Sequence, residues 1–191
     1  MSSARSTGKR EDGARAAEAE PARKRAAVAD SLAGEADELI SQVLAPGRWP
    51  KPSTIDRFLA DDRLERVLAL YARAMRLDPD EPAHPWNLAS TLNRIGLNDL
   101  ALGYIVRALG TADRTGDTEW AGSDAHLALA EIALDAGRAD MAVLAVARAQ
   151  QLSSGEEAVE RQSARLLRAA RRVSAHTRSD LEMAARLMGS T

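Results

Sequence analysis

The side chains that could carry acid–base or metal chemistry are few and widely separated in this chain. The three histidines are His84, His126 and His176, and there is no cysteine. Asp124 and His126 are two residues apart, a spacing that points them to different sides of a helix rather than to one metal ion. Without cysteine, thiolate nucleophiles, thiolate metal ligands and disulfides are excluded. We therefore expect no metal site.

Motifs of phosphate binding and of serine hydrolases are also missing. The sequence has no P-loop, no GxGxxG and no GxSxG pattern. The acidic pairs Asp61–Asp62 and Glu156–Glu157 lie where helices are expected to begin, a place where the helix dipole favours negative charge. We expect the protein not to be an enzyme and to bind no cofactor. An active site assembled from scattered residues is the alternative.

Composition favours a helical protein. Of the 191 residues, 45% are hydrophobic, 28% are charged and only 3% are aromatic. Most of the apolar residues are Ala, Leu and Val, and Ala, Leu, Arg and Glu enter helices at little cost. The net charge of −2 provides no general polycation for nonspecific nucleic-acid binding. The length suits one domain with a sizeable core, together with a tail.

No segment has the roughly 18 consecutive apolar residues of a membrane span. Residues 1–27 lack the apolar stretch of a secretory signal, so a cytoplasmic location is expected. Only Lys9, Lys24 and Lys51 among the 26 basic residues are lysines, and the chain is rich in alanine. This usage is typical of a GC-rich genome and indicates a bacterial source.

The flanks of the chain differ from its centre. Residues 1–27 have no large apolar side chain after Met1, so they have nothing to bury and we expect a disordered tail, whose Ala, Glu and Arg content would allow transient helix. Residues 28–63 are expected to form an N-terminal helical cap and a proline-rich connector. Residues 154–191 are expected to form a C-terminal helical hairpin, because capping-box patterns begin at Ser154 and at Ser179.

Residues 64–153 show helical periodicity interrupted by glycine and proline, and no segment has the period-2 pattern of a strand. The fold class is therefore predicted to be all-α. Three of the expected helices can be aligned, and the alignment has two sets of equivalent positions. The first set is Tyr71, Ile105 and Val146, and the second is Ala74, Ala108 and Ala149. The aligned alanines are 34 and then 41 residues apart, and 34 is the period of tetratricopeptide repeats.

The preceding helices align as well, over 87–96 and 128–137. This joint register resembles the tetratricopeptide repeat (TPR) family. There a large–small pair, here Leu88–Ala89 and Leu129–Ala130, packs the first helix of a repeat on the second, and a glycine makes the turn between them. The resemblance covers 64–153: two well-matched repeats, preceded by a half-repeat whose first helix is 52–60. It implies a superhelix of about three to four antiparallel hairpins including caps. An unrelated bundle of alanine-rich hairpins is the alternative.

The resemblance also implies that the first helices of the repeats line a concave groove that binds a partner. The residues expected there are Trp86, Ser90, Asn93, Arg94, Leu127, Glu131, Leu134 and Asp135. An aromatic ring, one cation and several carboxylates predict a partner segment with apolar and basic side chains, and another helix is one form of such a segment. Glu131 and Asp135 would repel the C-terminal carboxylate that some TPR domains bind. An ordinary solvated surface is the alternative.

A second candidate surface is a basic stripe on the helix expected after residue 155. It consists of Arg161, Arg165, Arg168 and Arg172, which share one helical face. Arginines in such a row suit phosphate or an acidic partner. The alternative is a solvated face that Glu157 and Glu160 partly neutralise.

These features predict a scaffold or adaptor that binds another protein or peptide segment in its groove. Two alternatives stay open. One is a regulatory component that contacts nucleic acid through the basic tail, Arg23–Arg25, or through the arginine stripe. The other is a structural subunit that self-associates through the ends of the helical stack.

Overall fold

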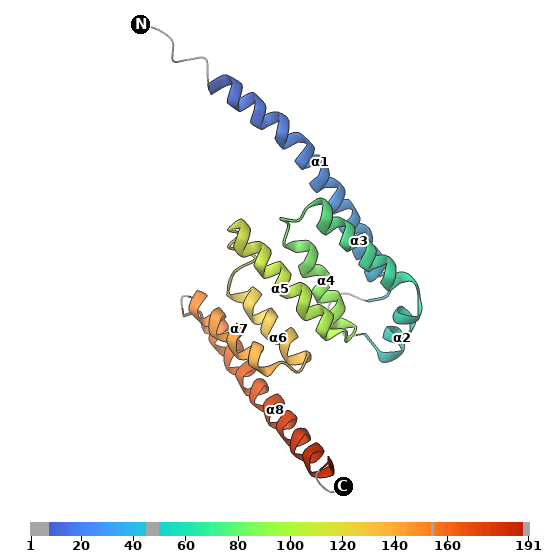
Figure 1. Ribbon diagram of the computed structural model, residues 1–191, viewed down its shortest axis with the longest axis vertical. Helices are drawn as coiled ribbons and strands as arrows, with labels where there is room; N and C mark the ends of the chain where they lie inside the picture. Colours follow the sequence, from blue (N-terminus) through green and yellow to red (C-terminus); the bar gives the residue numbers. More distant parts are fainter. Residues whose placement is uncertain (1–7, 45–49, 154, 189–191) are drawn as a thin grey trace. The chain divides into compact units, whose positions relative to one another are not determined.

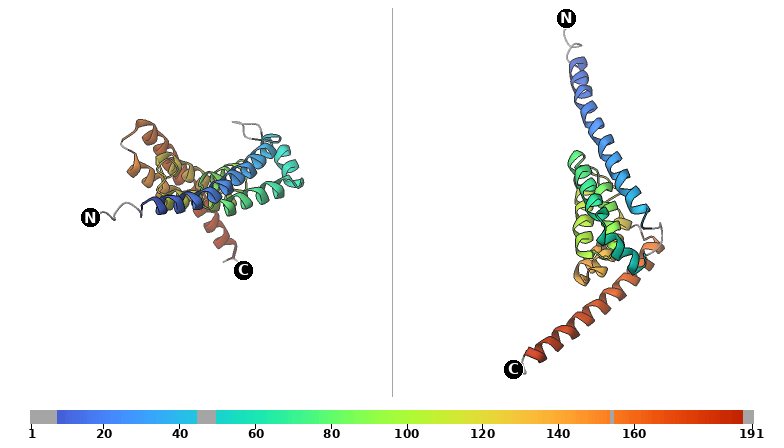
Figure 2. Two further views of the ribbon diagram at one scale, coloured as in Figure 1. Left: turned by 90° about the horizontal axis from the view of Figure 1, so that it is seen from above. Right: turned by 90° about the vertical axis from the view of Figure 1, so that its right-hand side faces the viewer.

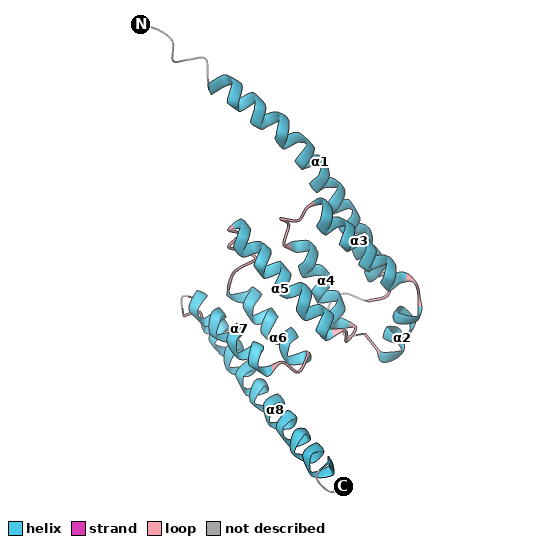
Figure 3. Ribbon diagram, in the orientation of Figure 1, coloured by secondary structure: helices cyan, strands magenta, loops and turns pink. Residues whose placement is uncertain are grey.

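The computed structural model describes residues 8–44, 50–153 and 155–188, and all regular elements in this part of the chain are helices. Figure 3 accordingly shows helices joined by loops, with no strand among the residues it describes. The prediction of an all-α protein is confirmed. The chain divides into two compact units, Met1–Glu81 and Pro82–Thr191. The expected 64–153 repeat region does not coincide with this division, because the helix Arg63–Leu77 belongs to the first unit.

The first unit contains α1 (Gly8–Ser41), α2 (Pro52–Ala60) and α3 (Arg63–Leu77). Helices α1 and α3 pack side by side, as Figures 1 and 2 show. Each buries one stripe of residues at helical spacing: Ala29, Ala33, Ala36 and Ile40 from α1, and Val67, Tyr71, Ala74 and Met75 from α3. The alanines of α1 let the two backbones approach closely around the large ring of Tyr71.

Polar contacts fix the register of α1 on α3. The Tyr71 hydroxyl donates to the Asp37 carboxylate, and Arg66 pairs with Glu35. The expectation that the helix 52–60 pairs with α3 is wrong, because α1 is the main packing partner of α3. The physical reason is length and pattern: α2 has nine residues and buries only Phe58, whereas α1 offers an apolar stripe over several turns.

Helix α1 begins at Gly8, so it includes most of the segment that was expected to be a disordered tail. This difference follows from the Ala, Glu and Arg content of the segment, because these residues have high helix propensity. Between Glu20 and Val28, however, no side chain is buried, whereas Ala29 is buried. This described part of the expected tail thus contributes nothing to the core, as its lack of large apolar residues requires. Residues 1–7 of the expected tail and 45–49 of the expected connector lie outside the described residues.

The second unit contains α4 (Ala83–Arg94), α5 (Asn98–Thr115), α6 (Ser123–Asp135), α7 (Ala139–Leu152) and α8 (Glu157–Met188). Helix α6 is central, since it packs against α5, α7 and α8, while α4 packs on α5 and α7 packs on α8 (Figure 1). Its neighbours on several sides explain why α6 is apolar over much of its surface.

Two turns of this unit are built in the same way. Gly96 between α4 and α5 and Gly137 between α6 and α7 have φ angles of 81° and 72°, in the left-handed region that favours glycine. In each turn the residue after the glycine donates its backbone N–H to a carbonyl five residues earlier, at 2.9 Å and 2.7 Å. The two helix pairs therefore have equivalent connections, and both glycines were predicted at these turns.

The aligned positions of α3, α5 and α7 also share an environment. All six are at most 1% exposed: Tyr71, Ile105 and Val146, and Ala74, Ala108 and Ala149. The register found in the sequence therefore corresponds to a register of burial. Each of these helices has a large and a small residue in the core, three positions apart.

The expected C-terminal hairpin is wrong: residues 157–188 form one helix, α8. No glycine or proline interrupts this stretch, and Ser179, which was expected to begin a second helix, is tolerated inside a helix at modest cost. Among the residues of α8 whose burial is described, 157–177, the buried ones are Val159, Ser163, Leu166 and Ala170. The second half continues past α6 and α7 (Figure 2, right).

Candidate functional site

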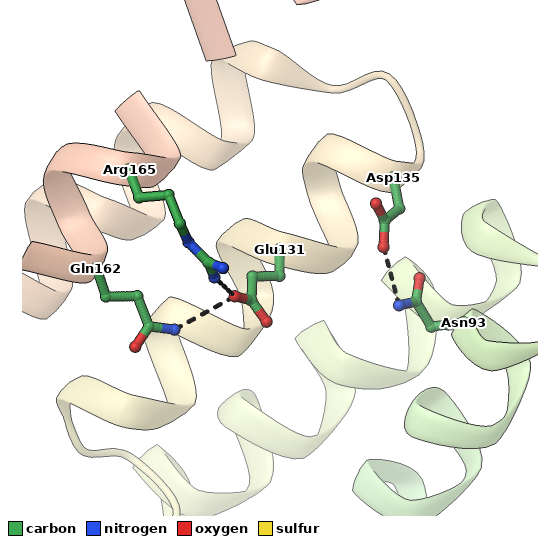
Figure 4. A network of polar contacts seen from close by, with 5 residues as sticks. All are labelled: Asn93, Glu131, Asp135, Gln162 and Arg165. Atoms are coloured by element: carbon green, nitrogen blue, oxygen red, sulfur yellow. Dashed lines mark hydrogen bonds and ion pairs between the residues drawn. The ribbon is translucent and has the colours of Figure 1, made fainter. Parts of the chain in front are cut away.

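Side chains from α4, α6 and α8 meet in a network of polar contacts, shown in Figure 4. The Nδ2 of Asn93 on α4 donates to Oδ2 of Asp135 on α6 at 3.0 Å. The backbone carbonyl of Asp135 accepts a second hydrogen bond, 2.8 Å long, from Nδ2 of Asn98 at the start of α5. The C-terminal end of α6 is thus fixed to the preceding helix pair by two amide side chains.

A second set of polar contacts joins α6 to α8 (Figure 4). The guanidinium of Arg165 pairs with Oε1 of Glu131, and Nε2 of Gln162 donates to that oxygen at 3.3 Å. The side chains of Arg165 and Glu131 are 64% and 42% exposed, so water screens this ion pair and its contribution to stability is modest. We call Asn93, Glu131, Asp135, Gln162 and Arg165 the α4–α6–α8 polar surface.

Helical spacing explains why these side chains converge. Glu131 and Asp135 are four residues apart, and Gln162 and Arg165 are three apart, so each pair lies on one face of its helix. The packing of α6 on α8 brings those two faces together. The polar surface therefore follows from two local patterns and one tertiary contact.

Three of the predicted groove residues take part in these two sets of contacts: Asn93 and Asp135 in the first, and Glu131 in the second. Ser90 lies one turn before Asn93 on α4 and is exposed. Arg94, which follows Asn93, and Leu134, which precedes Asp135, are half-buried.

Leu127 was also predicted to line the groove, and this prediction is wrong. Its side chain is 1% exposed and belongs to the core. The prediction assumed that α6 buries one narrow stripe, as a helix with one neighbour does. Because α6 packs against three helices, a wider arc of its circumference is buried.

Trp86 has an aromatic neighbour that sequence reasoning missed. Its ring meets that of Trp120 edge-to-face, with centroids 5.2 Å apart and planes at 70°. Trp120 precedes α6, and the Asp117 side chain fixes its loop by accepting hydrogen bonds from the backbone N–H groups of Glu119 and Trp120. Both rings are partly exposed, so the pair offers an apolar surface on the same face of α4 as Ser90 and Asn93.

The predicted arginine stripe is partly neutralised. Arg161 pairs with Glu157 one turn earlier on α8, at 2.9 Å, and Arg165 pairs with Glu131. Arg168 and Arg172 are exposed on the following turns. Two of the four arginines are therefore engaged by carboxylates of the same chain, which lowers the positive potential along the helix.

Comparison of the chain with known protein families and with curated proteins finds no match. The site must therefore be interpreted from its own chemistry. Among the described residues, no three His, Asp or Glu side chains are grouped so that they could hold a metal ion. In the same part of the chain, no helix combines the length and the apolar character that crossing a membrane requires.

His126 lies on α6 in a partly buried position with charged groups of both neighbouring helices nearby. Burial lowers the pKa of its imidazole, the positive charge of Arg148 on α7 lowers it further, and Asp113 on α5 opposes them. His126 therefore tends to stay neutral between α5 and α7.

Three participants had been missed: Trp120, Gln162 and Asn98. Gln162 lies three residues before Arg165, so the helical spacing of the arginine stripe could have placed Gln162 on the same face of the helix. Asn98 is the first residue of α5 and Trp120 lies in the loop before α6. Helical periodicity does not predict the contacts of residues in such places.

Proposed function

We propose that the protein is an interaction scaffold, with hairpins arranged as in TPR domains, and that its α4–α6–α8 polar surface binds a segment of another protein. One observation carries the proposal. Polar contacts join α4 to α6 through Asn93 and Asp135 and join α6 to α8 through Glu131 and Arg165, so partly exposed side chains of three helices that are not consecutive in the chain lie near one another (Figure 4). Continuous surfaces built from successive hairpins are the usual binding sites of helical repeat proteins.

The repeat arrangement draws support from two features of the fold. The glycine turns after α4 and α6 are equivalent, and the aligned large and small residues of α3, α5 and α7 are all buried. An unrelated hairpin bundle has no reason to repeat both features in one register.

The chemistry of the surface defines the partner segment we propose. Glu131 and Asp135 carry negative charge, but Arg165 and Asn93 already occupy part of their hydrogen-bonding capacity. The surface therefore offers carboxylates, amides and an arginine together rather than an acidic groove. The half-buried Trp86–Trp120 pair lies on the same face of α4. A segment with one apolar anchor flanked by polar and basic side chains matches this arrangement.

A charge swap tests the proposal without removing the internal ion pair. The double variant Glu131→Arg with Arg165→Glu keeps opposite charges on α6 and α8 but reverses which helix carries each. We expect it to fold like the wild type and to lose the partner. The measurement is crosslinking and mass spectrometry of the protein isolated from its own cells, followed by affinity measurement with the partner identified.

The matched control is Arg107→Glu, a charge reversal at an exposed position of α5. It should leave the partner bound. A partner that binds the charge-swap variant and the control as it binds the wild type would show that the α4–α6–α8 polar surface is not the binding site. The pairing of Arg161 and Arg165 with carboxylates makes a nucleic-acid site on α8 the weaker alternative. Binding of short DNA or RNA that falls with salt would reinstate it.

A further inference from the structure

The outward face of α7 exposes the most accessible large apolar side chain among the described residues. Leu144 is 71% exposed, and Val143 beside it is 44% exposed. Ala147, one turn further, is exposed as well. The opposite face of α7 is buried through its alanines and Val146, so this outward face has no packing role inside the unit. Exposed apolar side chains grouped in this way are typical of interaction surfaces.

Charges of opposite sign stand symmetrically around Leu144. Asp140 lies four residues before it and Arg148 four residues after it, and both are exposed. Their contacts within the chain are long: Oδ1 of Asp140 is 3.7 Å from Nε of Arg138, and Nη1 of Arg148 is 3.5 Å from Oε1 of Gln151. Both charges therefore remain available to an outside partner. By helical spacing they lie on the same side of α7 as Leu144.

We propose that the outward face of α7 binds the same face of a second copy of the protein, with the two helices antiparallel. A two-fold axis through Leu144 places Asp140 of each copy opposite Arg148 of the other, because the two residues are equally distant from the axis. The face is thus self-complementary in charge, as an isologous interface requires. No unrelated partner is needed to satisfy this pattern.

The side chains also fit helix-on-helix packing. A knob on one helix enters a hole made by residues i, i+3, i+4 and i+7 of the facing helix. On α7 such a hole is formed by Asp140, Val143, Leu144 and Ala147, and it can receive Leu144 of the other copy. The small side chain of Ala147 lets the helices approach closely. Since α7 has 14 residues and is about 21 Å long, the interface is small, and we expect a weak, reversible dimer.

Charge reversal with mixing tests this arrangement. Asp140→Arg and Arg148→Asp each turn both attractive pairs of the dimer into repulsive ones, so each variant alone should self-associate at least about tenfold more weakly than the wild type. Mixing the two variants restores both attractive pairs, and the dimer should return. Sedimentation equilibrium over a range of concentrations measures all three samples. The proposed antiparallel pairing predicts three results together: a wild-type dimer, weaker association of each variant alone, and recovery on mixing.

Two further variants separate this surface from others and from loss of folding. Leu144→Asp should abolish the dimer, whereas Val106→Asp, at a 44% exposed position of α5, should leave it intact. Circular dichroism checks that each variant is folded. A wild type that stays monomeric at every concentration overturns the proposal, including the case in which a different protein covers α7. A wild-type dimer that Leu144→Asp does not weaken, or that the mixture of charge variants fails to restore, overturns it too.

Discussion

Arg165 on α8 pairs with Glu131 on α6, so a residue expected in a basic stripe and one expected in a separate groove form a single ion pair. The two candidate surfaces of the sequence are therefore neighbours. Their charges partly cancel where α6 and α8 meet. This relationship changes the expected partner from one attracted by net charge to one recognised by a pattern of charges and amides.

The Glu131–Arg165 pair is predicted to matter more for recognition than for folding. Arg165→Ala should lower the free energy of unfolding by at most about 1 kcal/mol, because an exposed ion pair gains little over solvation. Urea unfolding followed by circular dichroism measures this. Arg168→Ala, at an exposed position one turn further, is the control and should change stability less. A loss several times larger at Arg165 would mean that the pair is a structural element.

Ser163 is predicted to be a weak point of α8. Its side chain is fully buried, and its Oγ has no hydrogen-bond partner among the described residues. A buried hydroxyl without a partner costs free energy, and alanine has the higher helix propensity. Ser163→Ala should therefore raise the free energy of unfolding, by up to about 1 kcal/mol. The exposed Ser174→Ala isolates the propensity effect. Destabilisation by Ser163→Ala would indicate that the hydroxyl has a partner in the folded protein.

Two glycines should respond oppositely to alanine. Gly103 lies inside α5 at an exposed position, and an added Cβ would meet no atom within 4 Å. Gly103→Ala should therefore stabilise the protein by about 0.5–1 kcal/mol, the difference in helix propensity. Gly137 has a φ of 72°, so Gly137→Ala should destabilise it by about 1 kcal/mol or more. Thermal unfolding of both variants measures the contrast. Equal effects of one sign would contradict the left-handed turn.

Tyr71 provides a test of the packing of α1 on α3. Tyr71→Phe keeps the buried ring but removes the hydroxyl that donates to Asp37. The expected cost is about 0.5–1.5 kcal/mol of unfolding free energy. In a double-mutant cycle, Asp37→Ala should cost less in the Tyr71→Phe background than in the wild type, because the shared bond is already gone. If the two changes in unfolding free energy were strictly additive, the Tyr71 hydroxyl and the Asp37 carboxylate would not be hydrogen-bonded in solution.

Much of the fold followed from periodicity. Helical spacing predicted an all-α chain, and the register of Ala74, Ala108 and Ala149 identified positions that prove to be buried. Glycine predicted the turns at Gly96 and Gly137, because only a residue without a side chain adopts their φ angles freely. These are local signals, and a single sequence carries them well.

Which helices pack against one another was harder to predict from the sequence. Helix α2 precedes α3 directly and was expected to pair with it, but α1 is the main packing partner of α3. Burial of the longer apolar stripe of α1 stabilises the fold more than a neighbour that is merely close along the chain. Leu127 was placed on a surface because the number of neighbours of α6 was unknown. The pairing of Glu131 with Arg165 depends on the register of α6 against α8, which no local pattern contains.

His126 makes the stability of the second unit depend on pH. Burial and the charge of Arg148 lower its pKa below the ordinary value of 6.5, and the charge of Asp113 only partly opposes them. Above that value the imidazole is neutral in both the folded and the unfolded chain, so it contributes no pH dependence. As the pH falls through 6.5, the unfolded chain takes up a proton that the folded protein resists. Unfolding is then favoured until the pH reaches the lowered pKa of the folded state.

We therefore expect the free energy of unfolding to decrease as the pH is lowered from about 7.5 to about 5.5, a range in which most carboxylates stay charged. His126→Gln removes the titrating group and should flatten this dependence. Urea unfolding of the wild type and the variant at several pH values measures the two slopes. A slope that survives His126→Gln would assign the pH dependence to other groups. A wild-type protein that gains stability on acidification would show that the pKa of His126 is raised instead.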